Sequence, residues 1–123
     1  MRRLAQRLGE NEELWGWAGR LHDLDFEETK DEPARHGRES AAWLTALGAS
    51  PDMVRAIQAH NAEALGLERE TKLDYALTCA ETITGLIVAT ALVQPDKKLA
   101  SVKAKSVRKR MKEPAFARNV RRE

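Results

Sequence analysis

Residues 70–95, ETKLDYALTCAETITGLIVATALVQP, decide the fold predicted from this sequence. Apolar and small residues recur here at spacings of three and four, which is the period of one face of an α-helix. Pro95 favours an end to the helix just before it. We therefore expect a long helix over about 70–93 that forms the core of an all-α protein. The positions that carry this pattern are Leu73, Ala76, Leu77, Ala80, Ile83, Thr84, Ile87, Val88, Ala91 and Leu92.

The sequence on both sides of this stretch predicts further helices and no strand. Asn11 is a good N-cap, and Ser50 followed by Pro51 is typical of a helix start. Gly48 supplies a stop after an amphipathic segment. The predicted fold class is a compact bundle of about five to six helices. The other expected helices cover 12–24, 36–47, 51–61, 107–112 and 115–120, with a polar loop at 25–35 and a turn at 64–67.

Length and composition indicate one soluble domain. The chain has 123 residues, is 42% hydrophobic and 33% charged, and contains one cysteine, Cys79. This length suits a single domain over 1–123. Cys79 cannot form an internal disulfide, and its apolar surroundings in sequence predict burial. The basic N-terminus is followed by no apolar run, so we expect a cytoplasmic protein with no membrane partner.

Charge is distributed unevenly along the chain. Residues 97–123 contain eleven basic and two acidic residues, a formal charge of +9, which leaves −7 on residues 1–96. A basic tail favours an anionic partner or docking against the acidic body. No ladder of aromatic residues accompanies these charges, so we do not expect a nucleic-acid partner. The expected tail is helical and either solvated or docked.

Each of the three histidines lies at the end of a predicted helix. His22, followed by Asp23, closes an apolar stripe; His36 opens the next helix; His60 closes the third. Imidazole and carboxylate together suit a divalent ion such as Mn²⁺, Zn²⁺, Fe²⁺ or Ni²⁺. The alternative for His22 is a hydrogen-bonded core histidine. For His36 it is a solvated helix start, and for His60 a cation at a helix C-terminus.

Glu81 is a further carboxylate, located in the middle of the long apolar helix. Its position in the repeat places it at the edge of the buried stripe. A surface carboxylate is the ordinary interpretation there, and a metal ligand is the functional one.

These residues belong to segments that resemble small bacterial hydrolases of the HD superfamily. The segments AGRLHDLDFEETKDEPARHG, AIQAHN, ALTCAETITGLIVATALVQPDKKL and KSVRKRMKEPAFARNVRRE follow one another in the family's order. The resemblance covers nearly the whole chain. It implies an all-α, metal-dependent phosphohydrolase that acts on a phosphate ester, with nucleotides among the family's substrates.

The resemblance also implies roles for individual residues. His22 would ligate one metal and Asp23 would bridge two, which makes Asp23 the expected catalytic residue. His36 and His60 would complete the second metal position. The last acidic ligand falls on Glu81, where the family usually has aspartate. Apart from the resemblance, Lys105 and Arg108 are expected to contact the substrate phosphate, which would reconcile the basic tail with phosphohydrolase chemistry.

The sequence departs from the family at both ends. The family's first histidine lies on a helix that precedes the segment beginning here at Met1, and the family continues beyond residue 123. We therefore expect a fragment or a minimal form in which the first metal position lacks a ligand. Apolar surface left by the missing helices favours a homo-oligomer. The alternative function is a degenerate HD domain that binds metal or nucleotide without turnover.

Overall fold

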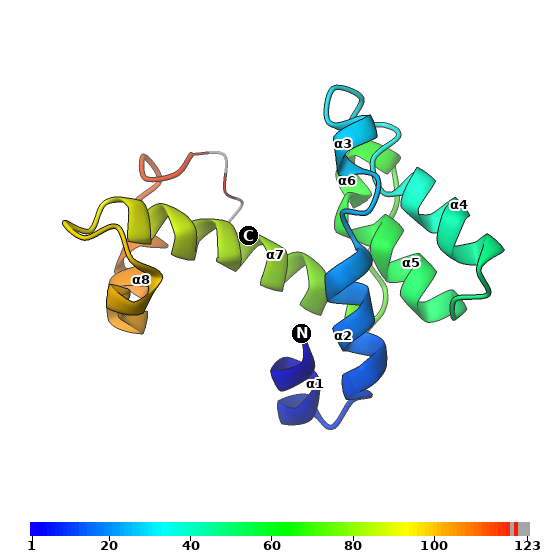
Figure 1. The fold of residues 1–123 in the computed structure, drawn as a ribbon, viewed down its shortest axis with the longest axis horizontal. Helices are drawn as coiled ribbons and strands as arrows, with labels where there is room; N and C mark the ends of the chain where they lie inside the picture. The colour runs from blue at the N-terminus through cyan, green and yellow to red at the C-terminus, as the bar shows by residue number, and fades with distance from the viewer. Residues whose placement is uncertain (119, 121–123) are drawn as a thin grey trace. The chain divides into compact units, whose positions relative to one another are not determined.

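Within residues 1–118 and 120, which the computed structural model describes, the backbone forms eight α-helices, one 3₁₀-helix and no strand (Figure 1). The predicted all-α class is thereby confirmed, while the likeness to an HD domain stays a prediction. The chain divides into two compact units, residues 1–79 and residues 80–123. The elements that begin in the first unit are α1 (Arg2–Leu8), α2 (Glu12–Leu21), α3 (Phe26–Thr29), α4 (Arg38–Ala46), α5 (Pro51–His60), α6 (Ala62–Leu65) and α7 (Lys72–Leu92).

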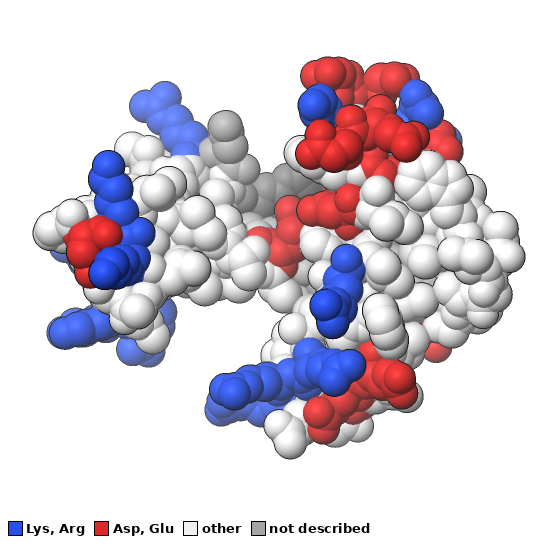
Figure 2. All heavy atoms as spheres, in the orientation of Figure 1, with Lys and Arg blue, Asp and Glu red and all other residues white. Residues whose placement is uncertain are grey.

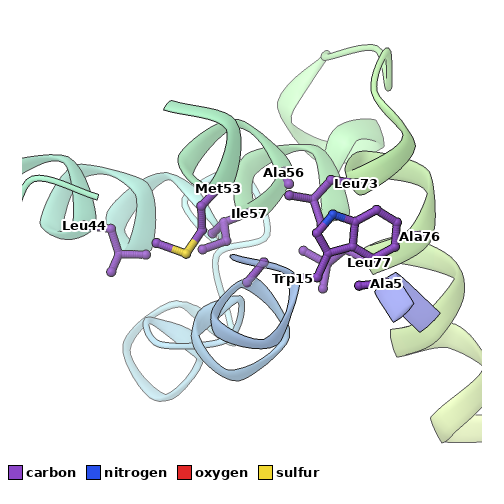
Figure 3. Close-up of a cluster of buried hydrophobic side chains, with 10 residues drawn as sticks. Ala5, Trp15, Leu44, Met53, Ala56, Ile57, Leu73, Ala76 and Leu77 are labelled. Atoms are coloured by element: carbon purple, nitrogen blue, oxygen red, sulfur yellow. The ribbon is translucent and has the colours of Figure 1, made fainter. Parts of the chain in front are cut away.

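Apolar side chains from five helices form the core of the first unit (Figure 3). Trp15 from α2, Ile57 from α5 and Leu77 from the first turns of α7 are at most 2% exposed. Helices α1 and α4 add Ala5 and Leu44 to the same cluster. The core therefore fixes α2, α4 and α5 relative to one another. These helices also carry or flank the three histidines.

A reciprocal cap starts α7. The Thr71 hydroxyl accepts the Asp74 N–H at 3.1 Å, and Asp74 Oδ2 accepts the N–H groups of Glu70 and Thr71 at 2.9 and 3.0 Å. This is the geometry of a capping box, which satisfies donors that a helix leaves unpaired at its start. Arg55 of α5 donates to the same Oδ2 at 3.1 Å, so the cap also links α7 to α5.

The second unit contains the rest of α7, the 3₁₀-helix η1 (Leu99–Ser101) and α8 (Ala104–Arg110). Leu86, Thr90 and Ala91 of α7 are buried, and so is Val107 of α8. The helix predicted over 107–112 corresponds to α8, which begins at Ala104 and ends at Arg110. The prediction of a single domain over 1–123 stays a prediction.

Four local predictions were wrong. Residues 114–118 form turns instead of a helix over 115–120, and Ala117 has a φ of 47°, which a right-handed helix does not allow. The end of that predicted helix includes residue 119, which lies outside the described residues. The predicted loop at 25–35 contains α3, and the predicted turn at 64–67 overlaps α6. Cys79, expected to be buried, is exposed.

Helix α7 is long and apolar enough to cross a membrane by length and composition alone, with a mean hydropathy of 1.5 over its most apolar window. The core helix of a soluble protein meets the same criterion. The first turns of α7 bury Leu73, Ala76 and Leu77 in the core of the first unit, and 28% of the apolar window is buried in all. The cytoplasmic location stays a prediction.

Candidate metal centre

Four residues from three segments of the first unit meet at the candidate site. His22 is the C-cap residue of α2, and Asp23 follows it directly. His36 lies in the loop just before α4, and His60 is the last residue of α5. His22 and His60 lie at helix ends as predicted, whereas His36 was expected to open α4 and lies just before it. The fold brings all four residues together.

A compact set of ligand atoms lies at the centre of this group. The Nε2 atoms of His36 and His60 are 3.0 Å apart. Asp23 Oδ1 lies 3.3 Å from the first nitrogen and 3.6 Å from the second. One ligand atom from each of these residues lies within 4.8 Å of the other two. This His/Asp triad is close enough to hold one metal ion.

The other ring nitrogen of each histidine faces an oxygen that accepts hydrogen bonds. His36 Nδ1 lies 2.8 Å from Asp25 Oδ1, and His60 Nδ1 contacts the carbonyl oxygen of Ile57. His22 Nδ1 lies 3.2 Å from the carbonyl oxygen of Gly19. A carbonyl or an ionised carboxylate can only accept, so each Nδ1 carries the proton. Each Nε2 of a neutral ring is then an acceptor that can bind a metal, as in many protein metal sites.

This arrangement fits a divalent cation. With both rings protonated at Nδ1, the lone pairs of the His36 and His60 Nε2 atoms face each other beside an anionic carboxylate oxygen. A single proton between two of these atoms leaves the third acceptor without a donor, whereas a cation interacts with all three. The Nε2 atoms of His36 and His60 are 3.0 Å apart, which is close enough for both to bind one ion.

Asp23 presents its two oxygens to different imidazoles. Oδ1 faces His36 and His60, whereas Oδ2 lies 3.2 Å from Nε2 of His22. The rings of His22 and His60 meet edge to face, with centroids 5.1 Å apart. A carboxylate oriented in this way can bridge two positions. This is the role that the resemblance assigns to Asp23.

Exposure and charge distinguish Asp23 from the imidazoles around it. Its side chain is 51% exposed, whereas those of His36 and His60 are 17% and 4% exposed. When His22 and His60 are protonated, their Nε2–H groups donate to Asp23 and hold its pKa well below its usual range. The carboxylate is therefore ionised at neutral pH. The triad is reached from solvent on the Asp23 side.

Two polar side chains hold the histidine-bearing segments in place. Asn61 Nδ2 donates to the carbonyl oxygens of Pro33 and His36 at 2.8 and 2.9 Å, which ties the loop before α4 to the end of α5. Arg69 donates to the carbonyl oxygen of His60 at 3.3 Å and to the Thr78 hydroxyl at 2.9 Å.

Asp25 is the functional candidate that the sequence analysis missed, because the residue was assigned to a solvated loop. It is fully buried and hydrogen-bonds His36. Burial alone would raise its pKa, but the N–H groups of Ser40 and Gly37 and the ring of His36 outweigh this and leave the pKa lowered. The local sequence pattern that could have indicated Asp25 is its position two residues after Asp23. In a charged loop, a spacing of two residues between carboxylates does not by itself indicate burial.

The other predicted site residues lie in the second unit. Glu81 is exposed on α7, and Lys105 and Arg108 are exposed on α8. Their roles as metal ligand and as phosphate contacts stay predictions.

The segment that follows Asp23 is acidic. Figure 2 shows acidic side chains gathered over α3 and the loop after it. These exposed residues are Glu27, Glu28, Asp31 and Glu32, with Lys30 and Arg35 paired to two of them. The half-exposed Phe26 ring contacts His36 edge to face, with centroids 5.8 Å apart. The surroundings thus favour cations and disfavour highly charged anions.

Comparison of the chain with protein-family models, curated proteins and solved structures finds no match. Membership of the HD superfamily therefore stays a prediction, which rests on the sequence segments quoted above. The geometry of the triad stands independently of it.

Proposed function

We propose that this chain is a metal-dependent phosphohydrolase of the HD type that acts on a phosphate ester. The observation that carries the proposal is the convergence of His36 Nε2, His60 Nε2 and Asp23 Oδ1, with both Nδ1 atoms already engaged by acceptors. These three residues would hold a divalent ion, Mn²⁺, Zn²⁺, Fe²⁺, Ni²⁺ or Mg²⁺. His22 and Asp23 Oδ2 would serve a neighbouring position.

A bound ion would supply a Lewis acid that polarises a phosphoryl oxygen and lowers the pKa of water. His36, His60 and Asp23 would hold that ion with three ligands, a number typical of catalytic sites that leave a position for water or substrate. Asp23 keeps its negative charge at the solvent-facing side, where substrate must arrive. The imidazoles of His36 and His60 are more buried, and the hydrogen bonds of their Nδ1 atoms fix the positions of their Nε2 atoms.

The charges around the site support a substrate of low charge. Exposed carboxylates on α3 and the loop after it repel a polyanion such as a nucleoside triphosphate. A phosphodiester carries one negative charge and meets less repulsion. Phosphodiesters, including cyclic or dinucleotide diesters, are therefore the substrate class we propose to test first.

The test compares hydrolysis of bis-p-nitrophenyl phosphate and p-nitrophenyl phosphate by the full chain, after removal of bound metal and reloading with each ion in turn. We expect slow hydrolysis, faster for the diester, that Asp23→Ala abolishes. Lys109 is exposed on α8 and serves as the control position, so Lys109→Ala should retain the activity. Activity that survives Asp23→Ala unchanged would contradict the proposal. Metal binding without any turnover would instead support the degenerate HD domain that binds without catalysis.

A further inference from the structure

Asp25 has a buried carboxylate whose two oxygens serve different partners. Oδ2 accepts the N–H groups of Gly37 and Ser40 at 2.8 and 2.9 Å. Oδ1 lies 2.8 Å from Nδ1 of His36. The residue is 0% exposed, so both sets of hydrogen bonds are shielded from water.

The contacts of Oδ2 explain why a carboxylate can be buried here. Helix α4 begins after Gly37, which has no side chain to cap the free N–H groups of the first turn. Asp25 caps that turn from a distant segment, and the positive end of the helix dipole favours its charge. The Ser40 hydroxyl in turn accepts the backbone N–H of Asp25 at 3.0 Å. The cap therefore holds the carboxylate in one orientation and leaves Oδ1 for His36.

The contact of Oδ1 determines which nitrogen of His36 carries the proton. An ionised carboxylate only accepts, so Nδ1 must donate. Thr29 Oγ1 is also near, 3.3 Å from Nδ1, but this hydroxyl donates to the carbonyl oxygen of Asp25 at 2.8 Å. With Nδ1 protonated, the lone pair of the neutral ring lies on Nε2, which faces His60 and Asp23.

We propose that Asp25 is a positioning residue for the metal centre, which fixes the tautomer and the ring orientation of His36 while it caps α4. The inference rests on the proposed metal site, and it adds a residue that acts only through His36. Hydrogen bonds of this kind, from a ligand histidine to a carboxylate behind it, raise ligand basicity and restrict ring rotation. At His60 the corresponding partner of Nδ1 is the backbone carbonyl oxygen of Ile57. A substitution at Asp25 can therefore alter one proposed metal ligand, His36, selectively.

Asp74 offers a closely matched control. It is also 0% exposed, and it also caps a helix by accepting two backbone N–H groups, those of Glu70 and Thr71. Its side-chain partner is Arg55 rather than a histidine. Asp25→Asn and Asp74→Asn therefore remove the same charge from similar caps, and only the first changes a contact to the metal site.

The experiment measures Zn²⁺ and Mn²⁺ affinity of the full chain by competition with a chromophoric chelator, for wild type and both variants. We expect Asp25→Asn to weaken binding by about tenfold to a hundredfold. Asp74→Asn should bind like wild type. If Asp25→Asn binds as tightly as wild type, or if both variants weaken binding equally, the positioning role is overturned.

A second measurement separates this inference from the proposed function. Long-range ¹H–¹⁵N NMR of the metal-free wild type at pH 8 reports which nitrogen of each of the three histidines is protonated. We expect the Nδ1–H tautomer at His36, and a shift toward a mixture in Asp25→Asn. An Nε2–H tautomer at His36 in wild type would overturn the inference, even if Asp25→Asn did not fold. Wild type that shows the Nδ1–H tautomer but binds neither ion would contradict the metal-dependent function and leave the Asp25 contact supported.

Discussion

Replacing Asn61 with alanine tests whether the loop before α4 is held in place for the metal site. The side chain donates two hydrogen bonds, to the carbonyl oxygens of Pro33 and His36. Each such bond contributes about 0.5–1.5 kcal/mol, so the two together contribute about 2 kcal/mol. A free energy of 1.4 kcal/mol corresponds to a tenfold change in an equilibrium constant. If all of the lost free energy shifts the equilibrium toward an open loop, metal affinity should fall by up to about thirtyfold.

The assay combines urea unfolding in chelator with metal titration. All three tryptophans, Trp15, Trp17 and Trp43, lie in the first unit, so their fluorescence reports the unfolding of that unit. Asn11→Ala is the matched control. Asn11 accepts two N–H groups as the N-cap of α2, and its loss should cost about 1 kcal/mol without changing metal affinity. Unchanged stability and unchanged metal affinity in Asn61→Ala would refute the reasoning.

Three other predictions concern stability and pH. The pKa values of Asp25 and Asp74 are lowered in the folded protein. Their contribution to the unfolding free energy is therefore present at neutral pH and should be lost as pH falls below about 3.8. Urea unfolding at a series of pH values should show a smaller loss of stability at low pH in Asp25→Asn and in Asp74→Asn than in wild type. Leu77→Ala, at a side chain 1% exposed, should cost about 2–5 kcal/mol in the same unfolding assay, whereas Leu47→Ala, at 80% exposed, should cost little; equal losses would contradict the assigned core. Metal affinity should fall on acidification because protons compete for the Nε2 lone pairs, and a pH-independent affinity in chelator competition would argue against histidine ligation.

The sequence predicted the helices with a strong apolar period, because that period reflects packing against one core. Asn11 is the N-cap that was expected, and Pro51 opens α5 as predicted. The four-residue helices α3 and α6 are too short to show a period. The helix expected over 115–120 does not form, and the backbone instead turns to a positive φ at Ala117.

The site was only partly predictable. His22 ends an apolar stripe, and that pattern alone placed it near the interior. His36 and His60 became candidates for one site chiefly through the resemblance, because helix ends carry no information about which ends meet. Asp25 was missed because its burial depends on the start of α4, a contact across twelve residues of charged chain. Long-range pairing of this kind is absent from any local pattern.

Isothermal titration of Zn²⁺ and Mn²⁺ into the metal-free full chain, compared with His60→Ala, tests the metal centre most directly. We expect wild type to bind one of these ions specifically through His36, His60 and Asp23. His60→Ala removes one of the two converging Nε2 atoms, so we expect it to lose that binding while remaining folded by tryptophan fluorescence. Absence of binding in the folded wild type, or equal binding by folded His60→Ala, would contradict the proposed metal centre.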